Sequence, residues 1–363
     1  MDFRLRRDRL AARLPELGVE ALLVTRLPNV RYLTGFTGSN GQVLVTAGDG
    51  TVFLTDGRYT EQSRREVPDL RRDSYSGGSG GPDLAQACAQ AARDAGVGRV
   101  GFESGGVTYR LYQQLASALD GGELVPVADE VEYQRWAKDE DEIELIERAQ
   151  AITDESFERI LAKLTEGVTE KDLALELEFT MRQNGAEALS FDSIVAFGES
   201  AAEPHHHPAD RPLRMGDVVK LDFGALFEGY HSDMTRTVAL GEPSAELREI
   251  HAVVARAHRA GIDAVRAGVP GGTPDSAARE IVREAGYGDG FGHSLGHGVG
   301  LEIHEGPTLR ANSLDVLPAG TVVTVEPGVY VPGLGGVRIE DMVEVTDEGC
   351  RIIGTSTREL VVV

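Results

Sequence analysis

The sequence predicts two domains, an α/β domain over residues 1–135 and an α+β domain over residues 136–363. Three observations favour this fold class. The chain of 363 residues is longer than a usual single domain, so it can bury two cores. Strand-like and helix-like patterns alternate as far as Leu124, as they do in α/β domains. All nine histidines occur at or after position 205, which assigns the chemistry to the second domain.

The first domain is predicted to begin with an amphipathic helix over residues 1–17, because Leu10, Leu14 and Leu17 recur on one helical stripe. The apolar run ALLV at residues 21–24 is predicted to form a strand. The run SGGSGG at residues 76–81 is too rich in glycine to hold a regular conformation by itself. We predict a flexible surface loop there, with a lid or a dimer contact as the alternative.

The second domain is predicted to begin with two helices. A long helix follows Trp136, because the acidic run at residues 139–141 lies where the positive end of the helix dipole would be. A second helix follows Thr169, whose hydroxyl resembles a capping box together with Asp172 three residues on.

Four carboxylates beyond these helices each interrupt a short apolar segment. Asp222 lies in VVKLDFGA and Asp233 in HSDMTRTV, two strand-like runs joined by a short loop. Glu326 in TVVTVEPGVY and Glu340 in GVRIEDMVEV repeat this arrangement. One such carboxylate alone would ordinarily lie on a solvated face. Four of them with one neutral histidine balance two divalent cations, and a water between two such ions is a strong nucleophile near neutral pH.

The histidines differ in how well they fit this site. His293 and His297 are four residues apart, but the glycines around them disfavour a helix. In an extended segment, residues 293 and 297 share a face, so His293 would point into the site that His297 serves. The alternative is a histidine hydrogen-bonded in a tight turn. His231, His251 and His258 have weaker claims, and we expect a surface role for the last two.

Several motifs together resemble the pita-bread metallopeptidases. They are LDFGALFEGYHSDMTRT, GHSLGHGVGLEIHE, VEPGVY and GVRIED in the second domain, with VRYLTGFTGSNG and FLTDGRY in the first. The resemblance covers nearly the whole chain and is closest to the proline-specific branch, which comprises Xaa-Pro dipeptidase (prolidase) and aminopeptidase P. It implies a creatinase-like N-terminal domain followed by a pita-bread metallopeptidase domain.

The resemblance also implies a set of site residues. By similarity, the metal ligands would be Asp222, Asp233, His297, Glu326 and Glu340. Glu326 would also accept the proton of the attacking water, and His304 and His205 would stabilise the transition state. His205 is preferred to His206 and His207 because it directly follows a proline, as the family's site histidine does.

Arg338 is the cation that the pattern places nearest to the ligands. In a single strand, residues 338 and 340 share a face, so Arg338 should reach the cavity that Glu340 serves. It would orient the ligand carboxylates or, together with His293, bind the substrate. Arg58 is a second candidate for a substrate carboxylate, with a surface or packing role as the expected alternative. Thr235 is predicted to hydrogen-bond a ligand carboxylate, with simple strand propensity as the alternative.

The resemblance implies an enzyme that hydrolyses the bond between an N-terminal residue and a following proline, with two divalent metal ions per chain. Oxygen-rich ligation with one imidazole favours Mn²⁺, with Co²⁺ or Zn²⁺ as alternatives. Prolidase action on Xaa-Pro dipeptides or short peptides is favoured over aminopeptidase P action on longer peptides. A methionine aminopeptidase, a creatinase-like hydrolase and a non-catalytic peptide-binding module are more distant alternatives, and the complete ligand set argues against the last.

Composition excludes several other classes of partner. The net charge of -23 disfavours nucleic acid and anionic membrane surfaces. No apolar run approaches the ~18 residues that span a bilayer, and the first residues are charged rather than signal-like. Two cysteines, Cys88 and Cys350, do not suggest a disulfide framework or a thiolate zinc site. We therefore expect a cytoplasmic protein, and the resemblance adds a homodimer.

Overall fold

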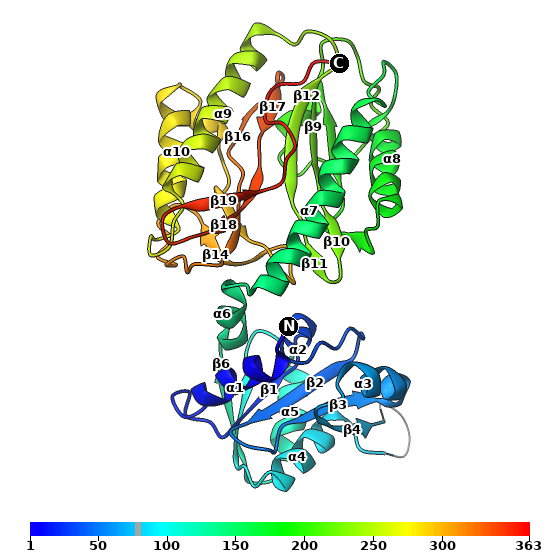
Figure 1. Cartoon of the computed structure of the whole chain (residues 1–363), viewed down its shortest axis with the longest axis vertical. Coiled ribbons are helices and arrows are strands. Elements are labelled where there is room, and N and C mark those ends of the chain that lie inside the picture. The colour runs from blue at the N-terminus through cyan, green and yellow to red at the C-terminus, as the bar shows by residue number, and fades with distance from the viewer. Residues whose placement is uncertain (77–80) are drawn as a thin grey trace. The chain divides into compact units, whose positions relative to one another are not determined.

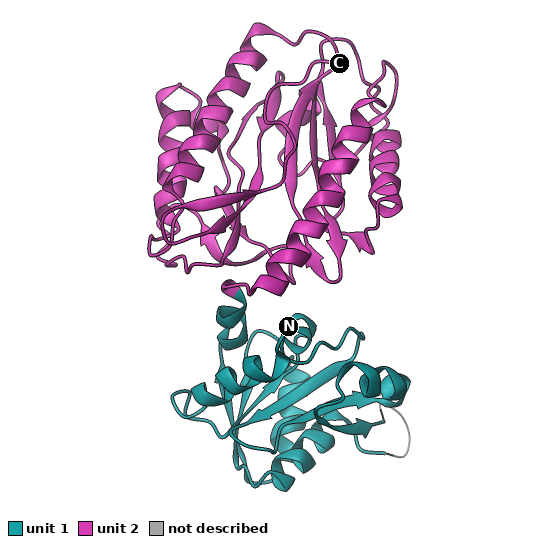
Figure 2. Cartoon of the chain, viewed as in Figure 1, with its two compact units in different colours: residues 1–135 teal, residues 136–363 magenta. Residues whose placement is uncertain are grey.

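The computed structural model describes residues 1–76 and 81–363, which divide into two compact units, Met1–Arg135 and Trp136–Val363 (Figure 2). The glycine-rich loop predicted at residues 76–81 therefore lies largely outside the described residues.

Unit 1 is a mixed six-stranded sheet with helices packed on it (Figure 1). The strand order is β4-β3-β2-β1-β5-β6, and β1 pairs antiparallel with β2 and parallel with β5. The strands are β1 (Ala21–Val24), β2 (Gly41–Thr46), β3 (Val52–Asp56), β4 (Arg71–Tyr75), β5 (Arg99–Glu103) and β6 (Glu123–Val127). The helices are α1 (Phe3–Arg13), α2 (Leu27–Thr34), η1 (Gly57–Tyr59), α3 (Thr60–Glu66), α4 (Leu84–Asp94), α5 (Tyr109–Ala118) and α6 (Glu130–Trp136).

The first helix is shorter than the sequence predicts. Helix α1 ends at Arg13 rather than at residue 17, although Leu10 and Leu14 are both buried as expected. Pro15 has no amide hydrogen to continue the helical ladder, which explains the early end. Arg58 has a largely exposed side chain that pairs with Asp56 at 2.7 Å, as expected for a surface arginine.

Unit 2 begins with the two predicted helices, α7 (Glu140–Leu161) and α8 (Glu170–Gln183). Asp139 caps α7 in a capping box with Glu142, and Thr169 caps α8 by accepting the amide of Asp172. Helices α9 (Ala245–Ala264) and α10 (Gly272–Glu284) lie on the other side of the unit, with strands between the two pairs (Figure 1). The short helices are η2 (Gly198–Ala202) and η3 (Gly288–Gly290).

The strands of unit 2 form two principal sheets, β12-β9-β8 and β14-β13-β15-β18-β19, with two smaller sheets, β11-β10-β7 and β16-β17. The strands of the first half are β7 (Ala188–Leu189), β8 (Ile194–Phe197), β9 (Val218–Phe223), β10 (Ala225–Phe227), β11 (Tyr230–His231) and β12 (Met234–Ala239). Those of the second half are β13 (Gly296–Gly298), β14 (Glu305–Leu309), β15 (Val322–Val325), β16 (Gly328–Val331), β17 (Gly335–Arg338), β18 (Asp341–Val345) and β19 (Cys350–Ile353).

Each principal sheet has its own apolar core. Residues of α7, α8, β8, β9 and β12 form one core, and residues of α9, α10, β15 and β18 form the other. The predicted order of an α/β domain followed by an α+β domain is confirmed. Among the described residues, none of the helices has the length and apolar character needed to cross a membrane.

Candidate functional site

The four carboxylates come from two antiparallel strand pairs, β9 with β12 and β15 with β18. Asp222 lies within β9, and Asp233 directly precedes β12. Glu326 directly follows β15, and Glu340 directly precedes β18. Alternation along β9 buries Val219, Leu221 and Phe223 in the first core, so Asp222 points away from that core. The two antiparallel pairs that the sequence predicts are therefore present, but the connection within each contains a further strand pair, β10 with β11 or β16 with β17, rather than a loop alone.

The two strand pairs meet at Thr235. The amide of Glu340 donates to the carbonyl of Thr235 at 3.1 Å. The Thr235 hydroxyl also donates to Oε2 of Glu340 at 2.6 Å, as predicted. Arg236 Nη1 donates to the carbonyl of Glu340 at 2.5 Å. These bonds fix one pair of carboxylates against the other.

Potential ligand atoms converge between the pairs. Asp233, His297 and Glu340 each offer one ligand atom, and these atoms lie within 4.8 Å of one another. His297 Nε2 lies 3.6 Å from Oδ2 of Asp233 and 3.5 Å from Oε1 of Glu326. The other ring nitrogen of His297, Nδ1, is 3.0 Å from the carbonyl of Gly298, which leaves Nε2 directed at the acids.

The electrostatics of this cluster fit a cation. Burial, and then the charge of neighbouring carboxylates, raises the pKa of Asp233 and of Glu340 well above the usual range. Burial also raises the pKa of Glu326 to about 8. Burial, with His304 adding to it, lowers the pKa of His297 to about 4, so its ring is neutral and available as a ligand. Oδ1 of Asp222 is buried without a hydrogen-bond partner among the described residues. Four crowded carboxylates, one of which has an oxygen without a hydrogen-bond partner, and one neutral imidazole form the kind of donor set that divalent cations bind.

Arg338 is buried beside the carboxylates and uses its donors on protein groups. Nη2 contacts Asp222, Nε donates to the Thr235 hydroxyl at 3.0 Å, and Nη1 donates to the Tyr330 hydroxyl at 2.7 Å and the Pro204 carbonyl at 3.3 Å. Arg338 is the last residue of β17 and Glu340 directly precedes β18, so the two do not share a face of a single strand as predicted. These contacts support the orienting role for Arg338.

Among the predicted site histidines, His297 and His304 lie next to one another. The rings of His297 and His304 lie 4.3 Å apart between centroids. Burial lowers the pKa of His304, and His205 lowers it further. The ring of His293 contacts the hydroxyl of Tyr330 at 2.9 Å, and burial followed by Arg338 lowers the pKa of His293 to about 4.

The run of three histidines is divided by its contacts. His206 lies 2.8 Å from Glu170 and 2.8 Å from Glu203, so its ring is occupied by carboxylates outside the cluster. His205 is exposed, and after burial it is the next cause of the lowered pKa of His304, which supports His205 as the member that serves the site.

Two expectations about the remaining histidines were wrong. His251 and His258 are 6% and 4% exposed, so neither is a surface residue. Both lie on the face of α9 that packs inward, and His258 Nε2 is 3.0 Å from Oδ2 of Asp341. His231 contacts the Ser190 hydroxyl at 2.8 Å, and burial lowers its pKa to about 4.

Sequence reasoning missed three buried polar residues next to the site, namely Tyr330, Glu170 and Lys220. Lys220 carried a usable signal, because it interrupts the apolar strand VVKLDF two residues before Asp222 and so shares its face. Burial lowers the pKa of Lys220 to about 7, with Arg338 as the second cause. Tyr330 and Glu170 reach the site only through contacts across the fold, which no local pattern reveals.

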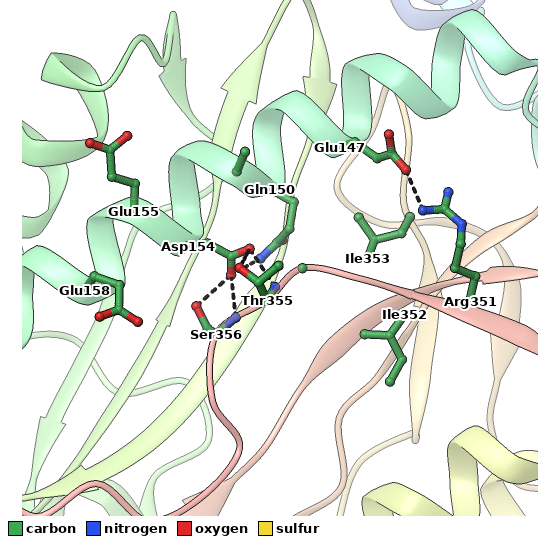
Figure 3. Close-up of a pocket in the computed structure, with 12 residues that line it drawn as sticks. Glu147, Gln150, Asp154, Glu155, Glu158, Arg351, Ile352, Ile353, Thr355 and Ser356 are labelled. Atoms are coloured by element: carbon green, nitrogen blue, oxygen red, sulfur yellow. Dashed lines mark hydrogen bonds and ion pairs between the residues drawn. The ribbon is translucent and has the colours of Figure 1, made fainter.

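A surface cavity of about 550 Å³ lies elsewhere, between α7 and residues 351–356 (Figure 3). Asp154 closes one side by accepting the Thr355 amide at 2.8 Å and the Ser356 hydroxyl at 2.6 Å. None of the predicted site residues, all of which the structure describes, lines this cavity. The convergence of ligand atoms, rather than the size of a cavity, therefore identifies the candidate site.

Comparison with known proteins agrees with this geometry. Residues 144–347 match metallopeptidase family M24, and residues 6–137 match the creatinase/prolidase N-terminal domain. The chain is 35% identical to the Xaa-Pro dipeptidase of Pyrococcus horikoshii over 94% of this chain and 95% of that protein. The structure of an Xaa-Pro dipeptidase from Bacillus anthracis matches with a TM-score of 0.95 at 40% identity, covering 100% of both chains. That of an X-Pro aminopeptidase from Thermotoga maritima matches with a TM-score of 0.90 at 39% identity, covering 99% of this chain and 100% of that one. The family resemblance is thus confirmed, and the chain belongs to metallopeptidase family M24, with a creatinase/prolidase N-terminal domain ahead of its metallopeptidase domain.

Proposed function

We propose that the protein is an Xaa-Pro dipeptidase that holds two divalent metal ions, with Mn²⁺ as the first choice. The proposed ligands are Asp222, Asp233, His297, Glu326 and Glu340. The observation that carries the proposal is the convergence of Asp233, His297 and Glu340, with Glu326 3.5 Å from His297, in a buried cluster where three carboxyls have raised pKa values. Xaa-Pro dipeptidases among the similar proteins support the substrate class. The oxygen-rich donor set favours Mn²⁺, although Co²⁺ and Zn²⁺ also fit one imidazole with carboxylates.

Divalent ions held there would polarise the scissile carbonyl and lower the pKa of the attacking water. Glu326 accepts a proton from that water and returns it to the leaving proline nitrogen. His304 and His205 donate hydrogen bonds to the charge that develops on the carbonyl oxygen. The ring of His304 lies beside that of His297, where such an oxygen would be within reach of the ligand cluster.

Arg338 and Thr235 hold the cluster in shape. Arg338 contacts Asp222 and Thr235, and Thr235 in turn donates to Glu340, so one chain of bonds orients two carboxylates. We propose this orienting role as the main one for Arg338, with substrate binding shared with His293 as its second role. If Arg338 mainly orients the ligand carboxylates, Arg338→Lys should weaken metal binding and lower the activity toward every substrate by the same factor. If Arg338 binds the substrate instead, Arg338→Lys should lose the preference for substrates that carry a free C-terminal carboxylate.

A comparison of three substrates tests the proposed specificity. The kcat/KM values are measured for an Xaa-Pro dipeptide, its C-terminal amide and an Xaa-Pro-Xaa tripeptide, with the Xaa-Ala dipeptide as the control for proline. We expect the free dipeptide to be hydrolysed fastest, because a carboxylate that enters a confined site must be paired there. If the amide and the tripeptide match or exceed the dipeptide, the activity is that of an aminopeptidase P.

We also propose a homodimer in the cytoplasm. The described thiols of Cys88 and Cys350 are both free, which is compatible with a reducing compartment. Sedimentation at micromolar concentration tests the assembly, and a monomer with full activity would contradict it. Fractionation of the source cells tests the location.

A further inference from the structure

Lys220 is a fully buried lysine on the same face of β9 as Asp222. Its relative exposure is 0%, and its neighbours Val219 and Leu221 point into the first apolar core. Alternation along the strand therefore directs the Lys220 side chain toward the side on which Asp222 lies. A buried ammonium group is costly unless all of its donors are used, so its contacts identify what it stabilises.

The ammonium group of Lys220 donates to main-chain carbonyls. Nζ lies 3.2 Å from the carbonyl oxygen of Ala201, 2.5 Å from that of Glu203 and 3.4 Å from that of Pro204. All three carbonyls belong to one short stretch of chain at the end of η2. Nζ thus meets three acceptors within four residues, which fixes the backbone there rather than neutralising a carboxylate.

The same stretch is held from two further directions. Arg338 Nη1 also donates to the Pro204 carbonyl, and Arg338 contacts Asp222. On the other side, the buried Glu170 carboxylate lies 2.8 Å from the His206 ring and accepts the amide of Ala209 at 2.9 Å. His205 lies between Pro204, whose carbonyl contacts Lys220 and Arg338, and His206, whose ring contacts Glu170.

We propose that Lys220 is a positioning residue that holds the Pro204–His205 peptide in place, so that the His205 ring is presented to the substrate. This inference rests on the proposed function, because it assigns Lys220 an effect on turnover that passes through His205. A side chain displaced by about 1 Å can cost on the order of a hundredfold in rate, so a backbone tether next to a reacting group has a measurable effect.

The test uses the full-length, Mn²⁺-loaded protein and the variants Lys220→Met, His205→Ala and their combination. Lys220→Met keeps the length of the stem and removes the three donors. We expect it to lower kcat for an Xaa-Pro dipeptide by roughly ten- to a hundredfold with a change in KM below about threefold. In the His205→Ala background, the same substitution should change kcat by less than about twofold, because the residue through which it acts is gone.

Hydrogen exchange supplies a readout that does not depend on activity. Amides of residues 201–207 should exchange about tenfold faster in Lys220→Met, while those of β9 and β15 keep their protection. Lys163→Met, which removes a partly exposed lysine paired with Glu176 at 2.7 Å, is the matched control and should change neither kcat nor the exchange of residues 201–207. Lys220→Gln, which keeps an N–H donor, should recover part of both effects and replaces Lys220→Met if that variant does not fold.

The outcomes separate the two proposals. An equal loss of kcat in both backgrounds, or unchanged exchange at residues 201–207, overturns the role of Lys220. If the wild-type protein hydrolyses no Xaa-Pro substrate, the proposed function fails, and the exchange comparison still decides whether Lys220 tethers this stretch.

Discussion

Removal of the metal ions should make the stability of unit 2 fall as the pH rises from about 5 to 8. Glu326 has a pKa raised from the usual 4.5 to about 8, and Asp233 and Glu340 are raised as well. In this window, the unfolded carboxyls have lost their protons while the folded carboxyls still bind them. Ionisation of the folded cluster is opposed by burial, so the free energy of unfolding decreases with increasing pH and no penalty remains below about pH 4.5.

The magnitude follows from Glu326 alone. Each pH unit between the two pKa values costs about 1.4 kcal/mol, so this carboxyl removes about 5 kcal/mol of stability by pH 8. That is a large part of the roughly 5–15 kcal/mol that typically separates folded from unfolded domains. Bound divalent ions pair the ionised carboxylates, so the loaded protein should lose little stability over the same range.

Urea unfolding of chelated and Mn²⁺-loaded protein at pH 5 and pH 8 measures the effect. Trp136 is the only tryptophan, and its indole ring lies against Gly306 in unit 2, so its fluorescence follows the relevant unit. Glu326→Gln is the matched control, because it cannot ionise and should reduce the pH dependence of the chelated protein. A chelated protein with the same free energy of unfolding at both pH values would refute the reasoning, as would an identical pH dependence with and without metal.

Substitutions and metal replacement test the remaining parts of the proposed site. Glu326→Gln should keep its fold but lose at least ~10²-fold in kcat/KM, because a base and a ligand charge are both removed; a metal-replete, active variant would exclude this role. Chelation should abolish hydrolysis, and Mn²⁺ or Co²⁺ should restore it with up to two ions per chain by elemental analysis; full activity in verified metal-free protein would contradict the mechanism. Thr235→Val should weaken metal binding by roughly ten- to a hundredfold, because it removes the 2.6 Å bond to Glu340, and unchanged affinity in a metal titration would show that this bond is dispensable.

Much of the fold could be predicted from the sequence because strand faces and helix starts depend on short-range patterns, whereas the proposed ligand set rests on the family resemblance. Alternation along VVKLDF sends Asp222 away from the core, and the acidic cap at residues 139–141 marks the start of α7. The length of α1 was missed because the leucine stripe continues past Pro15, where the backbone cannot continue as a helix.

Residues whose role depends on distant partners were harder to predict. His258 looks like a surface residue in an Ala- and Arg-rich helix, but it faces Asp341 from the inner side of α9. The roles of Arg338 and Lys220 likewise depend on the Pro204 carbonyl, which lies more than a hundred residues from Arg338 in sequence. Local periodicity assigns a face to each side chain, but not the partner that it meets there.

The bond between Arg338 and Asp222 joins residues that are 116 positions apart in the chain. During synthesis at roughly 5–20 residues per second, Asp222 is therefore added to the chain roughly 6–23 s before Arg338. For most of that interval the nascent chain carries Asp222 and Asp233 without Glu326 and Glu340. A cation that binds early meets an incomplete and solvated site, so selective loading should follow release from the ribosome. The metal content of the mature enzyme would then reflect the ions present where folding ends.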